Sequence, residues 1–164
     1  MIKYTTSKVV FEEIPDKVTL AINISNCQNR CKGCHSSELL LNIGKELTQS
    51  EIDSLIIKNS GINCICLMGE GNDQLALVKL LKYVKDKYPE ISLGLYSGRD
   101  NVENEILTWV DYIKVGGYNQ DLGPLNSKTT NQRLYHYNKN ERNNKLLFPK
   151  EWDDITYRFW SKKR

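Results

Sequence analysis

Residues 26–35 of the chain run Asn26-Cys27-Gln28-Asn29-Arg30-Cys31-Lys32-Gly33-Cys34-His35. The three cysteines have the spacing C-x3-C-x2-C, so three thiolates lie close enough along the chain to bind three irons of a [4Fe–4S] cluster. Such a triad leaves the fourth iron without a protein ligand, whereas electron-transfer clusters are normally held by four cysteines. We therefore predict a [4Fe–4S] cluster on Cys27, Cys31 and Cys34, with its fourth iron open to a small molecule.

A zinc site is the alternative interpretation of the same residues. The three cysteines and His35 would make a Cys3His set, and structural zinc sites use four such ligands. These ligands usually come as two pairs separated by a longer loop. Here all four candidates lie within residues 27–35, and His35 directly follows Cys34, which makes simultaneous binding awkward. The pattern favours the cluster and leaves zinc as the second interpretation.

The composition is that of an ordinary globular domain. The chain has 164 residues, of which 40% are hydrophobic and 26% charged, and its net charge is +3. That charge is too small to indicate nucleic-acid binding, and the basic residues 162–164 are most simply a solvated tail. The sequence has no apolar run of about 18 residues and no signal-like start. We expect one cytoplasmic domain over residues 1–164, with neither a membrane nor a nucleic acid as partner.

The hydrophobic pattern alternates between expected strands and expected helices. The expected strands are 18–24, 62–68, 91–96 and 112–115, and more weakly 133–137 and 145–148; the expected helices are 48–59, 73–88, 102–109 and 152–160. Alternation of this kind predicts a parallel sheet with helices outside. A closed eightfold barrel needs about 250 residues. We therefore expect an open, partial (β/α) barrel of about six parallel strands, with a core over about 18–135 and a C-terminal extension over 136–164.

Function in a parallel α/β sheet lies at the carboxyl ends of the strands. The cysteine loop follows the first expected strand, and turns that contain glycine follow the next three: Gly69-Glu70-Gly71, Ser97-Gly98-Arg99 and Gly116-Gly117-Tyr118. We expect these four loops to converge on one rim. Cys64 and Cys66 alternate along strand 62–68, so they share a face, and we interpret them as core residues rather than a second metal site.

Four segments together resemble the radical S-adenosylmethionine (SAM) superfamily. They are Cys31-Lys32-Gly33-Cys34-His35, Leu67-Met68-Gly69-Glu70-Gly71, Tyr96-Ser97-Gly98 and Thr130-Asn131-Gln132-Arg133. Within the superfamily the chain is most similar to the activators of glycyl-radical enzymes, and among these to the activating proteins of anaerobic ribonucleoside-triphosphate reductase. The resemblance implies a [4Fe–4S] cluster and SAM as cofactors. It also implies the reductase as protein substrate, which would receive a glycyl radical, and an external low-potential electron donor such as a flavodoxin.

The resemblance implies cofactor-binding roles for Gly69, Glu70, Ser97 and Asn131, and no catalytic residue beyond the cluster and the cofactor. Glu70 beside Gly69 suits the methionine ammonium of SAM, because a carboxylate accepts strong charge-assisted hydrogen bonds. Ser97 suits the ribose or the carboxylate of SAM. For the segment 131–133, contact with the cofactor and contact with the partner both stay open.

The chain departs from the superfamily pattern at three positions. Met68 stands where relatives often have the first glycine of Gly-Gly-Glu-Pro, and Gly33 stands where they often have an aromatic residue that shields the adenine. Gly116 stands where they often have an aspartate, so no role of that aspartate carries over. Two alternatives stay open: an activator of another glycyl-radical enzyme, such as pyruvate formate-lyase, and a non-catalytic zinc-binding module.

Overall fold

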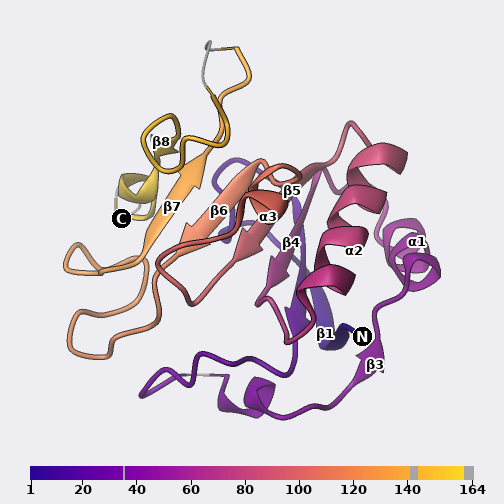
Figure 1. Ribbon diagram of the computed structural model, residues 1–164, viewed down its shortest axis with the longest axis horizontal. Helices are drawn as coiled ribbons and strands as arrows, with labels where there is room; N and C mark the ends of the chain where they lie inside the picture. Colours follow the sequence, from indigo (N-terminus) through magenta and orange to yellow (C-terminus); the bar gives the residue numbers. More distant parts are fainter. Residues whose placement is uncertain (35, 141–143, 161–164) are drawn as a thin grey trace.

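The computed structural model describes residues 1–34, 36–140 and 144–160. These residues form one mixed eight-stranded sheet with the strand order β3-β1-β2-β4-β5-β6-β7-β8 (Figure 1). The strands are β1 Lys3–Val10, β2 Thr19–Ile24, β3 Lys45–Glu46, β4 Cys64–Met68, β5 Ser92–Tyr96, β6 Tyr112–Val115, β7 Arg133–His136 and β8 Asp153–Asp154. The α-helices are α1 Gln49–Lys58, α2 Gln74–Lys87 and α3 Asn104–Leu107, and the 3-10 helices are η1 Ser37–Leu40 and η2 Thr156–Phe159.

The expected open barrel of about six parallel strands is wrong. Only β2, β4, β5 and β6 run parallel to one another, and the pairings at both edges of the sheet are antiparallel. A parallel neighbour requires a long crossover, usually a helix. The fully described connections 11–18 and 116–132 contain no helix, so β1 and β7 lie antiparallel to their neighbours.

Two further expectations near the C-terminus are also wrong. Residues 145–148 form turns instead of a strand, and the expected helix over 152–160 is the short strand β8 followed by the single 3-10 turn η2. The side chain of Asp154 explains the second difference. Its Oδ1 accepts hydrogen bonds from Thr156 N at 3.0 Å and from Thr156 Oγ1 at 2.6 Å. Such local side-chain hydrogen bonds stabilise a turn at the start of η2 in place of a regular helix.

The two long helices begin at capping side chains. Thr48 Oγ1 accepts a hydrogen bond from Glu51 N at 3.0 Å, and Asp73 Oδ1 accepts one from Ala76 N at 3.1 Å. With α3, these helices cover one face of the sheet (Figure 1). The main core lies between them and the strands, and it includes buried residues of both layers such as Leu67, Leu77, Leu81, Leu95 and Ile113.

The opposite face of the sheet carries a smaller core around the two cysteines of β4. Cys64 and Cys66 are fully buried beside Ile14, Tyr112 and Leu134, so their expected place in the core is confirmed. Burial raises the pKa of the Cys64 thiol to about 12 and that of Cys66 well above its usual value. Both side chains are therefore neutral thiols that pack as small apolar groups.

Candidate functional site

The loop after β2 carries the three triad cysteines to the carboxyl ends of the parallel strands. The strands β4, β5 and β6 point toward this loop (Figure 1). Its start is held by the hydrogen bond from Cys27 N to Leu39 O at 2.8 Å, and its turn by the one from Cys34 N to Cys31 O at 3.2 Å. Arg30 has a φ of 46°, which coils the backbone tightly between the first two cysteines.

Glycines at the ends of β5 and β6 make room for the cysteine loop. A Cβ atom at Gly98 would lie 2.5 Å from Asn29 Nδ2 and 3.0 Å from Asn29 Cβ. A Cβ atom at Gly117 would lie 3.1 Å from Cys31 Sγ. The expected convergence of glycine-bearing turns on the cysteine loop is therefore confirmed for these two turns, because a side chain at either glycine would crowd Asn29 or Cys31 of the loop.

The three cysteines line one open cavity of about 330 Å³. The sheet contributes neighbouring residues of one cross-strand row to it: Asn23 of β2, Met68 of β4, Tyr96 of β5 and Lys114 of β6. A volume of this size falls within the range of small-molecule sites, about 300–1,000 Å³. The geometry therefore joins the triad to a cavity that a cofactor-sized molecule would fit.

The thiols suit the predicted cluster in kind and number. All three are free and partly exposed, and Ser36 N donates a hydrogen bond to Cys34 Sγ at 3.5 Å, a contact of the type that tunes iron–sulfur centres. Among the described residues, which include the three cysteines, no three His, Cys, Asp or Glu side chains are placed so that they could hold a metal ion together, so the thiolates would have to move closer to one another to bind a cluster. His35, the fourth ligand of the zinc interpretation, lies outside the described residues.

Lys114 brings a buried positive charge to this cavity. Its side chain is 7% exposed, and its Nζ donates to Gly116 O at 3.0 Å and lies 5.5 Å from the centroid of the Tyr96 ring. Burial lowers the pKa of Lys114 to about 8, and negative charge on the neighbouring Cys31 opposes that shift. Lys114 is not among the residues predicted from the sequence, although a lysine within the apolar strand 112–115 was a signal that could have revealed it.

Gly69 and Glu70 follow β4 but face different spaces. Gly69 lines the cysteine cavity with a φ of 118°, a conformation that favours glycine. Glu70 lines an adjoining cavity of about 390 Å³, which it shares with Cys27 and Asn29. Of the predicted pair, only Gly69 therefore faces the space that all three cysteines share.

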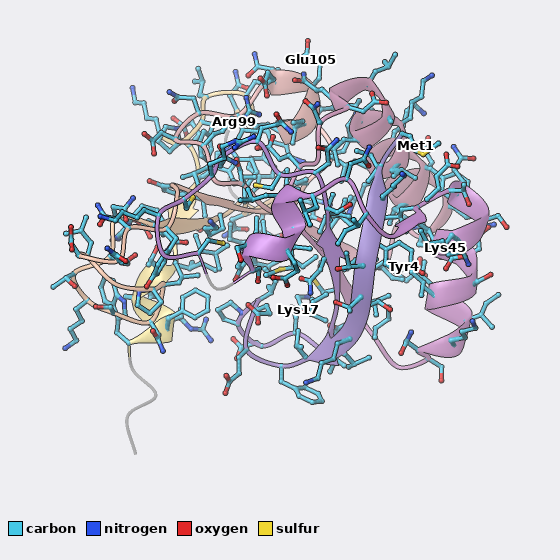
Figure 2. All side chains as sticks on the ribbon, turned by 90° about the horizontal axis from the view of Figure 1, so that it is seen from below. Met1, Tyr4, Lys17, Lys45, Arg99 and Glu105 are labelled. Carbon is cyan, nitrogen blue, oxygen red and sulfur yellow. The ribbon has the colours of Figure 1, made fainter. Side chains whose placement is uncertain are left out.

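The Glu70 carboxylate is already engaged by two protein side chains. Its Oε2 accepts from Ser97 Oγ at 2.6 Å and from Arg99 Nε at 3.0 Å, and its Oε1 accepts from Arg99 Nη2 at 2.5 Å. Arg99, labelled in Figure 2, also pairs with Glu103. Ser97 is fully buried. This network ties the loops after β4 and β5 together, and it leaves Glu70 little capacity to accept from a ligand.

The three residues of the Asn-Gln-Arg segment have separate environments. Asn131 is exposed, and its Nδ2 donates to Gly117 O at 3.0 Å, so it lies outside the cysteine cavity. Gln132 is buried and lines that cavity. Arg133 pairs with Asp154 on β8 at 2.7 Å. The predicted cofactor ligand Asn131 is thus not placed with the cysteines, whereas its neighbour Gln132 is.

Comparison with known proteins adds no relative for this site. No protein-family model matches the chain, and no curated protein or solved structure matches it either. None of the helices in the described residues is long and apolar enough to cross a membrane. The site is therefore interpreted from its own residues: three free thiols, one buried cation and a cavity that opens to solvent.

Proposed function

We propose that the chain is a radical SAM enzyme that installs a glycyl radical on anaerobic ribonucleoside-triphosphate reductase. The observation that supports this most strongly is that Cys27, Cys31 and Cys34 line one open cavity at the carboxyl ends of the parallel strands. In this proposal the three thiolates hold a [4Fe–4S] cluster, SAM occupies the cavity, and a low-potential protein such as a flavodoxin donates the electron.

When bound, the cluster and SAM would together supply hydrogen-abstracting radical chemistry through one-electron reduction of a sulfonium. The chain's own residues bind and shield these groups. Lys114 sets a positive charge against the negative charge of three thiolates, an interaction that a low dielectric strengthens. The Met68 and Tyr96 side chains on the sheet face add apolar surface that limits water in the cavity.

The network around Glu70 has a supporting role in this proposal. Because its carboxylate is bound by Ser97 and Arg99, we assign to Glu70 the task of holding the loop that carries Gly69. The backbone of Gly69, which lines the cavity without a side chain, then stays accessible to the amino-acid part of SAM. A direct bond from the Glu70 carboxylate to the ligand is not part of the proposal.

The test is activation of a purified reductase under anaerobic conditions. The reconstituted protein, a reductant and SAM are mixed with the reductase, and the glycyl doublet is followed by electron paramagnetic resonance. We expect about one glycyl radical per 5′-deoxyadenosine formed, and no doublet when the reductase glycine is replaced by alanine. The variant Cys31→Ala should give no radical, whereas the buried control Cys66→Ala should give the wild-type yield.

The outcomes separate the chemistry from the choice of partner. A doublet on pyruvate formate-lyase, with none on the reductase, would keep the radical SAM chemistry and overturn the proposed partner. Absence of both the doublet and 5′-deoxyadenosine with either protein, from a chain that carries its cluster, would overturn the proposed function.

A further inference from the structure

Gln132 is the member of the Asn-Gln-Arg segment that faces the cysteine cavity. The residue is 7% exposed, and its backbone N–H donates to Thr130 Oγ1 at 3.0 Å, which fixes the chain just before β7. Gly116 at the end of β6 lies against it, since a Cβ atom there would come within 3.2 Å of Gln132 Cα. The missing side chain at Gly116 lets the two strand ends approach closely beside the cavity.

The carboxamide of Gln132 is unpaired inside the protein. Three carboxamides line the cavity, and two of them are engaged: Asn23 Nδ2 donates to Thr6 Oγ1 at 2.7 Å, and Asn29 Nδ2 lies 3.9 Å from Cys27 Sγ. The side chain of Gln132 makes no hydrogen bond with any part of the chain that the structure describes. The amide atoms of Gln132 keep access to the solvent of the cavity, because the fully buried side-chain atoms without a partner in the described residues are Thr19 Oγ1 and Asp111 Oδ1. A ligand that fills the cavity displaces this solvent and must itself pair with the carboxamide, because an unpaired polar group away from water costs free energy.

The donor and acceptor of a carboxamide match one particular edge of adenine. A glutamine accepts from the N6 amino group with its oxygen and donates to N7 with its nitrogen. The same cavity is lined by Tyr118, Pro124 and Leu125, whose apolar surfaces suit a flat ring. The ammonium of Lys114 can only donate hydrogen bonds, so it cannot match an edge that presents both a donor and an acceptor.

We propose that Gln132 is the residue that recognises the adenine base of the bound sulfonium nucleoside, an inference that rests on the proposed function. It pairs with the N6/N7 edge and makes the site selective for adenine over hypoxanthine. In hypoxanthine the amino group is replaced by an oxygen, so this edge presents two acceptors, and the glutamine oxygen meets a repulsive partner.

The test compares S-adenosylhomocysteine with S-inosylhomocysteine as ligands of the cluster-loaded protein, by calorimetric titration. The wild type should bind the adenosyl compound about ten- to a hundredfold more tightly. In Gln132→Met, which keeps the length of the side chain, the adenosyl affinity should fall until the ratio is near one. The neighbouring Asn131→Ala, outside the cavity, should keep the wild-type ratio. Circular dichroism and iron content establish that each variant is folded and loaded, and Gln132→Leu carries the same test if the methionine variant does not fold.

Two results would overturn the inference. In the first, the wild type binds both nucleosides equally; in the second, Gln132→Met keeps the wild-type ratio of the two affinities, whether or not both affinities fall. If the wild type loads its cluster and binds both nucleosides equally, only the role assigned to Gln132 is overturned, and the proposed function stands. If the protein neither loads a cluster nor binds either nucleoside, the proposed function is overturned as well.

Discussion

Replacing Gly98 by alanine should impair cluster binding while leaving the fold intact. The new Cβ atom would lie 2.5 Å from Asn29 Nδ2 and 3.0 Å from Asn29 Cβ. The Asn29 amide can rotate away, but its Cβ atom cannot, and because carbon atoms pack at about 3.5 Å the cysteine loop must retreat by about 0.5 Å. Metal sites tolerate deviations of only about 0.2 Å in their ligand distances. The overpacking costs about 1–3 kcal/mol, less than the stability of an ordinary domain.

The assay is the iron and sulfide content of Gly98→Ala after anaerobic reconstitution, with thermal unfolding measured in parallel. We expect a folded protein that loads its cluster poorly. In the double variant with Gly98→Ala, the change Asn29→Gly removes the side chain that the new Cβ atom contacts, and it should restore cluster loading. Gly61→Ala is the matched control: its φ of 92° strains an alanine, but no atom lies within 4 Å of the added Cβ. It should lose stability and keep full loading. Full loading of Gly98→Ala, or no rescue by Asn29→Gly, would refute the steric reasoning.

Three other predictions concern the side chains around the site and the helices. Cys66→Ala should cost about 1 kcal/mol of stability and keep the wild-type iron content, and loss of iron would place Cys66 in the metal site. Arg99→Met leaves the Glu70 carboxylate without its cation and should lower stability by about 2 kcal/mol in urea unfolding, whereas an unchanged midpoint would show the pair to be dispensable. The hydroxyl of Tyr88, the larger cause, and the ammonium of Lys87 lower the pKa of Asp53 to about 2. The stability that Asp53 adds is therefore present above about pH 4 and lost as the pH falls toward 2, and Asp53→Asn should flatten that decline.

The parts of the fold that the sequence predicts correctly are those that local chemistry determines. The helices α1 and α2 begin at capping side chains, and the parallel strands such as β4 and β5 are short apolar runs buried on both faces. The strand β1 is different, because Lys3–Val10 is polar and half exposed at the side of the sheet. The direction of the edge strands depends on long-range pairing and on connections without helices, and no local pattern encodes either.

In the candidate site, too, some features follow from the local sequence and others depend on long-range pairing. The three cysteines of the triad do line one cavity, and the glycine turns at Gly98 and Gly117 lie against the cysteine loop, while the role of the cysteines as cluster ligands stays a prediction. The assignment of Glu70 to a ligand could not anticipate its pairing with Arg99, 29 residues further along the chain. The lysine within the apolar strand 112–115 is visible in the sequence, but its place beside the cysteine cavity depends on the register of β6. Such pairings and orientations emerge only when the strands are aligned in register.

The metal content of anaerobically purified protein tests the central claim most directly. Iron, acid-labile sulfide and zinc are measured on the same sample, for the wild type and for Cys27→Ala, Cys31→Ala and Cys34→Ala. The account predicts about four irons and four sulfides per wild-type chain after reconstitution, and loss of the cluster in each of the three variants. One zinc per chain, with no uptake of iron and sulfide, would contradict it and favour the zinc-binding module.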